Sequence, residues 1–246
     1  MCLANGLEMK RVARNVERLS VWNRIYATEG MRWGFDPSQA ARLAVEGIRE
    51  EMLPPGLVVD MGCGYGRDLL LLSRAYRSRE CIGIEGAAGV AELWEAMVSR
   101  RSGAADDRSH GRMSIKLCDV FALDETFGFR RGVALAFANY VFHLLDTREA
   151  LGLMRRIGAA LCWHGYFAGS FVATADATFG THRRVGRNRE RTDDGIWQYF
   201  DEADVRTLLD AAHLEIVSLQ RVTEIAEKRG RPDVVTFWFA IARKPQ

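Results

Sequence analysis

A hydrophobic run that ends in an acid and passes into alternating glycines constrains the fold of this chain more than any other feature. The stretch is VVDMGCGYGRD, from Val58 to Asp68. The apolar residues before Asp60 predict a buried strand, and the leucines that follow Gly66 predict a helix. Glycines at alternate positions let the backbone turn sharply and let a ligand approach closely. The stretch therefore predicts a strand, a ligand-binding turn and a helix, the repeating unit of an α/β fold.

Strand and helix patterns alternate through the rest of the chain. Strands are predicted over 57–61, 81–85, 113–118, 133–138, 166–173, 214–222 and 234–242, and helices over 68–76, 90–100, 147–162 and 201–212. This alternation predicts a doubly wound α/β fold with a mostly parallel, seven-stranded sheet and helices on both faces, that is, a Rossmann-like fold. We interpret residues 1–246 as one domain with its core over 57–246.

The first 55 residues are predicted to form a helical lid segment on that core. Apolar residues at helical spacing, from Val12 to Tyr26, predict an amphipathic helix over 7–28. A second helix is predicted from a Ser38 cap to Met52. Four aromatic residues of the segment are candidates for a lid that excludes water from a ligand: Trp22, Tyr26, Trp33 and Phe35. The alternative is that they pack on the sheet as ordinary core residues.

Two more acids stand at the ends of predicted strands. Glu85 ends the second strand, where a carboxylate can accept hydrogen bonds from both hydroxyls of a ribose. Asp119 follows the third strand, where an acid can reach an adenine amino group. The dinucleotide fingerprint G-x-G-x-x-G would need glycine at Arg67, and no Gly-Lys-Ser/Thr follows the turn as in a P-loop. The pattern therefore favours a nucleoside ligand other than NAD or a nucleoside triphosphate.

The motifs DMGCGYG, GIEG and LCDVF resemble the first three motifs of class I S-adenosylmethionine-dependent methyltransferases, and the resemblance extends over residues 57–244. It implies a Rossmann-like fold, S-adenosylmethionine as cofactor and methyl transfer as the reaction. In that family the glycine loop holds the methionyl part, the acid of the second strand takes the ribose, and the acid after the third strand frames the adenine. The implied cofactor-binding residues are Trp33, Asp60, Gly62, Cys63, Gly64, Gly66, Glu85, Gly86, Asp119, Val120, Ala138 and Asn139.

The leading segment WNRIYATEGMRWG resembles small-molecule members of the family, such as the tellurite- and thiopurine-resistance methyltransferases. In those enzymes an aromatic-rich N-terminal segment folds over the cofactor. This resemblance implies a small-molecule substrate that is methylated on oxygen, nitrogen or sulfur. Trp22 and Tyr26 are then candidate substrate contacts as well as lid residues.

Candidates for a catalytic residue follow the fourth strand, in ALAFANYVFHLL. Tyr140 and His143 are the titratable side chains there, although a histidine at this place is often structural. The Asn/Asp-Pro-Pro-aromatic motif of nucleic-acid amino methyltransferases is absent, because Val141 follows Tyr140. A base is needed only if the nucleophile carries a proton, so the sequence names no certain catalytic residue.

A basic segment over 182–191, HRRVGRNRER, indicates a second possible class of substrate. Arg183, Arg184 and Arg187 are candidates for binding an anionic substrate or an RNA backbone. The alternative is a solvated loop, since acids are interspersed and follow the segment. With 34 basic and 32 acidic residues the net charge is only +2, which argues against a nucleic-acid partner. The alternatives to a small-molecule methyltransferase are an RNA or protein methyltransferase, an NAD-dependent oxidoreductase and a non-catalytic binding module.

No metal site is expected, because the five cysteines are scattered and none lies in a Cys/His cluster at metal-ligand spacing. No apolar run approaches the length of about 20 residues that spans a bilayer. The N-terminus has no apolar core of the secretory type. We therefore expect a cytoplasmic enzyme with no membrane partner, and the sequence does not indicate its oligomeric state.

Overall fold

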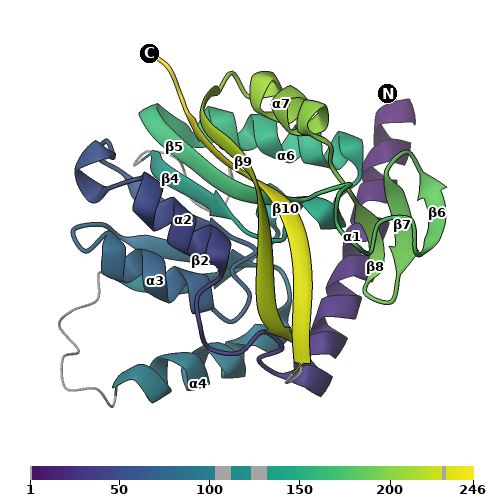
Figure 1. Ribbon diagram of the computed structural model, residues 1–246, viewed down its shortest axis with the longest axis horizontal. Coiled ribbons are helices and arrows are strands. Elements are labelled where there is room, and N and C mark those ends of the chain that lie inside the picture. The colour runs from purple at the N-terminus through teal and green to yellow at the C-terminus, as the bar shows by residue number, and fades with distance from the viewer. Residues whose placement is uncertain (1, 103–111, 123–131, 229–230) are drawn as a thin grey trace.

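The computed structural model describes residues 2–102, 112–122, 132–228 and 231–246. Its main sheet has seven strands in the order β3-β2-β1-β4-β5-β10-β9 (Figure 1). The strands are β1 (Leu57–Met61), β2 (Cys81–Glu85), β3 (Met113–Leu117), β4 (Val133–Ala138), β5 (Leu161–Val172), β9 (Glu215–Lys228) and β10 (Arg231–Arg243). β1 to β5 are parallel, whereas β10 runs antiparallel to both β5 and β9. This arrangement confirms the predicted doubly wound, mostly parallel sheet.

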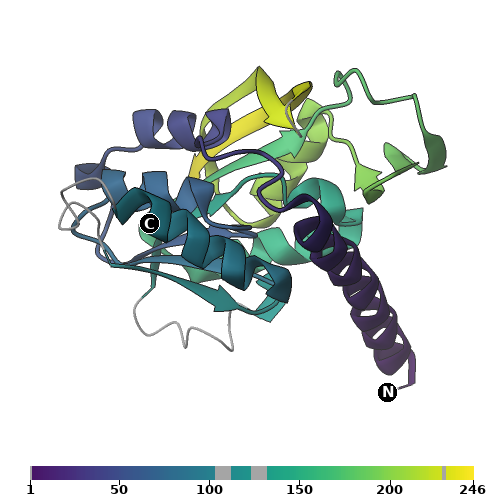
Figure 2. The same ribbon diagram turned by 90° about the horizontal axis from the view of Figure 1, so that it is seen from below.

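Helices cover both faces of the sheet (Figures 1 and 2). One face carries α2 (Gln39–Gly47), α3 (Arg67–Ala75) and α4 (Ala91–Ser102), and the other carries α6 (Thr147–Ala160) and α7 (Glu202–Ala211). Short 3-10 turns lie at Glu50–Met52, Ala88–Val90, Val120–Ala122 and Phe142–Leu144. Because both faces are covered, β1, β2 and β4 are buried along their whole length, which explains why most of their residues are apolar.

Helix capping fixes where the helices begin. Ser38 caps α2, since its side chain accepts a hydrogen bond from Ala41 N. Asp201 caps α7 by accepting from Asp204 N, and Asp146 forms a capping box with Glu149 at the start of α6. The predicted caps Ser38 and Asp201 are therefore confirmed. The helix predicted over 147–162 is shorter, because α6 ends at Ala160 and β5 begins at Leu161.

The N-terminal helix α1 (Cys2–Glu29) lies at one end of the molecule, and its first turns project away from the core (Figure 2). The predicted apolar stripe is only partly correct: Tyr26 is buried, but the side chain of Val16 is 62% exposed. Tyr26 packs beside Gly64 and Gly89, in the loops that follow β1 and β2. α1 therefore covers the edge where the ligand was predicted to bind.

The basic segment forms a second, three-stranded antiparallel sheet and not a loop. Its strands are β6 (Arg183–Gly186), β7 (Arg189–Thr192) and β8 (Gly195–Gln198). This small sheet lies at the right of the molecule in Figure 1. Arg32, just after α1, makes two hydrogen bonds of 3.1 and 2.9 Å to the carboxylate of Asp194 in the β7–β8 turn. That buried pair joins the small sheet to the lid segment.

Candidate functional site

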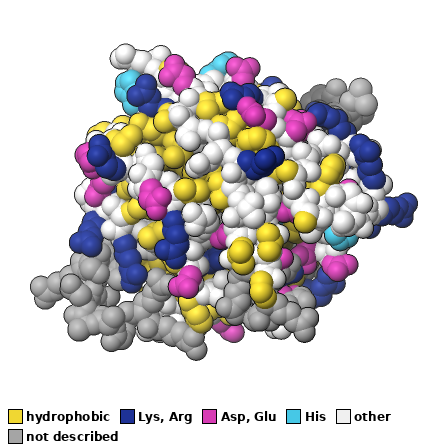
Figure 3. Space-filling model, in the orientation of Figure 1, with side chains coloured by type: hydrophobic (Ala, Val, Ile, Leu, Met, Phe, Trp, Pro, Cys, Tyr) yellow, Lys and Arg dark blue, Asp and Glu magenta, His cyan; other side chains and the backbone are white. Residues whose placement is uncertain are grey.

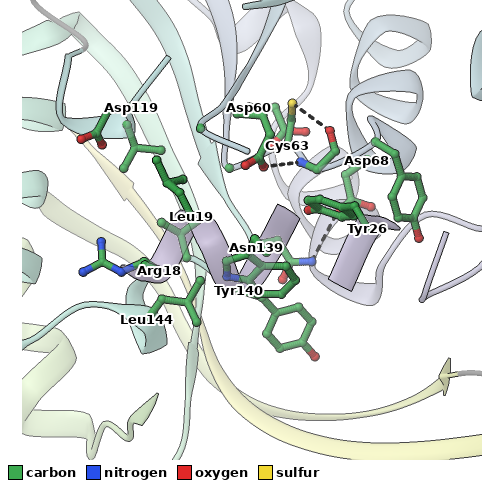
Figure 4. Close-up of a pocket in the computed structure, with 18 of the residues that line it drawn as sticks. Arg18, Leu19, Tyr26, Asp60, Cys63, Asp68, Asp119, Asn139, Tyr140 and Leu144 are labelled. Atoms are coloured by element: carbon green, nitrogen blue, oxygen red, sulfur yellow. Dashed lines mark hydrogen bonds between the residues drawn. The ribbon is translucent and has the colours of Figure 1, made fainter. Parts of the chain in front are cut away.

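A cavity opens beside the carboxyl end of β1, which lies between β2 and β4 in the sheet. Such a switch point in strand order leaves a crevice at the carboxyl ends of parallel strands. The cavity encloses about 950 Å³ including its open mouth. In the view of Figure 4, Asp119, Leu19 and Arg18 lie at one end, Tyr26 and Asp68 lie at the other, and Asp60 lies between them. α1 and the turn that follows it form the roof.

The glycine loop between β1 and α3 forms the floor. Gly64 has a φ of 54°, in the left-handed region that favours glycine, and its N–H donates a 3.0 Å hydrogen bond to Glu85 Oε2. A Cβ atom on Gly66 would lie 2.4 Å from the ring of Trp94 in α4. Gly62 and Gly64 therefore shape the cavity, whereas Gly66 lets α4 pack closely.

Glu85 lies at the end of β2 with its carboxylate in the cavity wall. Besides the bond from Gly64, its Oε1 accepts a hydrogen bond of 2.8 Å from Ala87 N. Burial raises the pKa of Glu85, and these backbone N–H groups oppose the increase. A carboxylate can accept about four hydrogen bonds, so Glu85 can still bind hydroxyl donors of a ligand.

Asp60 lies at the end of β1 and is almost fully buried. Its Oδ2 has no hydrogen-bond partner among the described residues. Burial raises the pKa of Asp60 well above 3.8, and the neighbouring carboxylates Asp68 and Glu85 raise it further. A buried carboxylate oxygen without a donor is costly, so this wall of the cavity fits a ligand that brings a cation or an N–H.

The raised pKa of Asp60 predicts a pH dependence of stability. The folded chain holds the carboxyl proton of Asp60 more tightly than the unfolded chain does. Protonated Asp60 therefore contributes fully to stability below pH 3.8, and this contribution is lost as the pH rises through the raised pKa of the folded state. Asp60→Asn removes the titration. Relative to wild type, its free energy of unfolding is expected to rise by at least about 1 kcal/mol from about pH 4 to about pH 8.

Urea unfolding across this pH range measures the difference. The matched control is Asp210→Asn, which makes the same chemical change at an exposed position of α7. If the free energy of unfolding of Asp60→Asn changes with pH as that of wild type does, the inference that position 60 carries a buried, unpaired carboxylate is wrong.

Asp119 lies just after β3, at the other end of the cavity. Its Oδ1 accepts a hydrogen bond of 3.0 Å from Phe121 N. Its Oδ2 accepts one of 2.7 Å from the side-chain amide of Asn15 in α1. The third predicted acid is therefore at the cavity and is already in contact with the roof.

Asp68, in the first turn of α3, connects three segments around the cavity. Its Oδ1 accepts from Ser38 N at 2.7 Å, and its Oδ2 accepts from Ser38 Oγ at 2.8 Å. The side chain of Asn139, after β4, donates to the same Oδ2 at 3.1 Å. The carboxylate thus holds the lid segment and the β4 loop at fixed positions.

Aromatic rings form the roof above the glycine loop. The ring of Trp22 lies 5.7 Å from those of Tyr26 and Trp33, measured between centroids. The hydroxyl of Tyr65, within the glycine loop, accepts from Trp33 N and donates to Gly34 O. Through these contacts Trp22, Tyr26 and Trp33 lie together over the cavity. Phe35 does not line it.

The cavity brings together most of the residues predicted to bind a cofactor. These lining residues are Trp33, Asp60, Gly62, Cys63, Gly64, Glu85, Gly86, Asp119, Val120 and Asn139. Trp22, Tyr26 and Tyr140 line it as well, whereas Gly66 and Ala138 do not. Residues that sequence reasoning missed also line it: Asn15, Arg18, Leu19, Tyr65, Arg67, Asp68, Val141, Leu144 and Leu145.

The two candidate catalytic residues differ in position. Tyr140 lines the cavity and donates a 3.1 Å hydrogen bond to Glu224 Oε2 on β9. Burial, and then the charge of Glu224, raise the pKa of Tyr140 well above 10.0, so the phenol keeps its proton. His143 lies behind the cavity wall, with its ring 4.6 Å from that of Trp197 in β8. Neither geometry is that of a general base facing the cavity.

The basic candidates Arg183, Arg184 and Arg187 lie on the β6–β7 hairpin and do not line the cavity. Arg187 is 72% exposed and pairs at 3.1 Å with both Asp201 and Asp204 at the start of α7. Part of the positive charge of this hairpin is therefore neutralised within the chain. Among the described residues there is no group of three or more side chains that could hold a metal ion.

Comparison with known proteins identifies the fold. No protein-family model matches the chain, and no curated protein sequence matches it significantly. A methyltransferase structure from Anabaena variabilis is 15% identical, with a TM-score of 0.66 over 92% of each chain. The magnesium protoporphyrin IX methyltransferase of Synechocystis, with bound S-adenosylmethionine, is 13% identical, with a TM-score of 0.59 over 92% of this chain and 97% of that one.

A third solved structure extends over nearly the whole chain. It is the 1,6-didemethyltoxoflavin-N1-methyltransferase of Burkholderia thailandensis, with bound 1,6-didemethyltoxoflavin and S-adenosylhomocysteine. It is 20% identical, with a TM-score of 0.57 over 97% of this chain and 90% of that one. The chain therefore has the fold of the class I S-adenosylmethionine-dependent methyltransferases.

Proposed function

We propose that this protein is an S-adenosylmethionine-dependent methyltransferase that acts on a small-molecule nucleophile. One observation carries the proposal: the acids that end β1 and β2 and follow β3 converge with the glycine loop on one roofed cavity. Asp60 would meet the charged methionyl end, Glu85 the ribose and Asp119 the adenine. The unpartnered Oδ2 of Asp60 fits a cofactor that brings an ammonium group.

The cofactor, when bound, supplies a methyl group already activated by the positive charge of its sulfur. The chain must then align the nucleophile with that methyl and exclude water. Trp22, Tyr26 and Trp33 close the site from solvent, and the ring faces of such residues can also attract a cation. The network around Asp68 fixes the β4 loop beside them. None of these roles requires a dedicated base.

Several features support a small substrate over RNA or protein. α1 covers the cavity, and the basic hairpin does not line it. On the face shown in Figure 3, Lys and Arg side chains are interspersed with Asp and Glu and form no single basic patch. Two of the similar structures are named for the methylation of small compounds.

The proposal includes three predictions from the sequence: the division into a lid over 1–55 and a core over 57–246, the tellurite- and thiopurine-type subfamily, and a cytoplasmic location. No helix among the described residues is both long and apolar enough to cross a membrane.

Titration calorimetry tests the proposal directly. We expect the protein to bind S-adenosylhomocysteine with micromolar affinity or tighter, and NAD at least about 100-fold more weakly, because Arg67 replaces the glycine that a dinucleotide site needs. Release of S-adenosylhomocysteine from S-adenosylmethionine during a small-molecule screen then identifies the substrate. Binding of NAD in preference to S-adenosylhomocysteine would contradict the proposal.

A further inference from the structure

One face of α1 is directed into the cavity. Five residues of the helix line it: Asn15, Arg18, Leu19, Trp22 and Tyr26. Arg18 and Leu19 are adjacent, and each lies three or four positions from both Asn15 and Trp22, so these residues share one side of the helix. The face is polar at Asn15 and Arg18 and aromatic at Trp22 and Tyr26. A helix that only packed on the core would carry apolar residues throughout this face. The polar end of the face therefore indicates contact with a ligand or with polar wall residues.

Asn15 connects this face of the helix to Asp119. Its Nδ2 lies 2.7 Å from Asp119 Oδ2, a short distance for an N–H···O bond and typical of one to a charged acceptor. The other oxygen of Asp119 accepts from Phe121 N. The carboxylate is thereby held in one orientation by two donors, one from its own loop and one from the roof.

The position of Asn15 is fixed by neighbouring contacts along α1. Arg18 pairs at 3.0 Å with Glu149, which belongs to the capping box of α6. Leu19 approaches so closely that its Cδ2 lies 2.6 Å from where a Cβ atom on Gly86 would be. Further along, Asn23 Oδ1 accepts from Gly89 N at 3.0 Å. The helix is therefore seated on the loops after β2, and Asn15 is held against Asp119.

We propose that Asn15 is a specificity residue for the base of the cofactor and completes, with Asp119, a pair of acceptors for the 6-amino group of adenine. An amide has one carbonyl oxygen and one NH₂ group. Because the NH₂ of Asn15 donates to Asp119, its carbonyl oxygen stays available as an acceptor. An exocyclic amino group has two N–H donors, one for each acceptor.

The same pair discriminates against a 6-oxo purine, which would place an acceptor where the amino group belongs. Leaving buried acceptors without donors is the costly outcome. The inference rests on the proposed function, because it assumes that an adenosyl cofactor occupies this cavity.

The test measures binding of S-adenosylhomocysteine and of S-inosylhomocysteine, its 6-oxo analogue, by calorimetry. In Asn15→Ala we expect the affinity for S-adenosylhomocysteine to fall about tenfold and that for S-inosylhomocysteine to stay within about twofold of wild type. The matched control is Ser20→Ala, on the exposed side of the same helix. It should bind both ligands as wild type does.

The outcomes separate this inference from the proposed function. An equal loss of affinity for both ligands in Asn15→Ala would show a packing role only and would overturn the inference. Unchanged affinity of Asn15→Ala for both ligands would also overturn the inference. Asn15→Asp is a second variant that preserves shape but places a like charge beside Asp119, and it should weaken S-adenosylhomocysteine binding more than Asn15→Ala. If wild type bound neither ligand, the proposed function itself would fail.

Discussion

Gly64→Arg is expected to abolish binding of S-adenosylhomocysteine, with a loss of affinity of at least about 100-fold. Two physical effects combine. At a φ of 54° a side chain is strained, and the Cβ atom would lie 3.1 Å from the hydroxyl of Tyr26 in the roof. The long arginine side chain must then extend into the cavity. The N–H of the same residue positions Glu85 Oε2, so the proposed ribose contact is disturbed as well.

Calorimetry with S-adenosylhomocysteine measures this effect, and circular dichroism checks that the variant is folded. The control is Arg187→Ala, which removes two ion pairs of an exposed side chain on the β6–β7 hairpin, outside the cavity lining. It should bind S-adenosylhomocysteine within about twofold of wild type, since exposed ion pairs contribute little. Retained affinity in Gly64→Arg would mean that the glycine loop does not hold the cofactor. A loss in Arg187→Ala would instead give the hairpin a role in binding.

The central strands could be predicted from the sequence because burial on both faces leaves a simple pattern. β1, β2 and β4 have the predicted bounds, and most of their residues are apolar. Asp60 and Glu85 interrupt that pattern only at the next-to-last residue of β1 and the last residue of β2. An acid at the end of a buried strand is a strong local signal, and both acids line the cavity.

The roof of the site could not be predicted in the same way. Asn15 and Asp119 are 104 positions apart, and no local pattern connects them. An asparagine on an amphipathic helix looks like an ordinary solvent-facing residue until the helix is placed over the strand ends. Only the spacing of Asn15 with Leu19 and Trp22 could have suggested that they share a face.

The small sheet was missed because its sequence is charged rather than apolar. Arg191 is exposed, but Glu190 between its arginine neighbours is buried and accepts hydrogen bonds from Gly180 N and His182 N. Strand β7 is thus held by polar contacts, and polarity alone predicts a solvated loop. The bond from Arg32 to Asp194 is a further long-range contact that sequence patterns do not reveal.

Asp68→Ala is expected to lower both stability and cofactor affinity. The carboxylate accepts three hydrogen bonds in a buried place, from Ser38 N, Ser38 Oγ and Asn139 Nδ2. Alanine leaves these donors without an acceptor, and each buried unsatisfied group costs roughly 1–3 kcal/mol. We expect the free energy of unfolding to fall by about 3 kcal/mol, allowing for partial relaxation around the smaller side chain.

The same substitution releases the lid segment at Ser38 and the β4 loop at Asn139, and both segments contribute residues to the cavity lining. Binding must then include the entropic cost of ordering both segments, so the affinity for S-adenosylhomocysteine should fall at least about tenfold. Urea unfolding and calorimetry measure the two effects. Asp210→Ala, at an exposed position of α7, is the matched control and should change the free energy of unfolding by less than about 0.5 kcal/mol. An Asp68→Ala variant as stable as this control would show that the network does not hold the site together, and the roof would then depend on α1 alone.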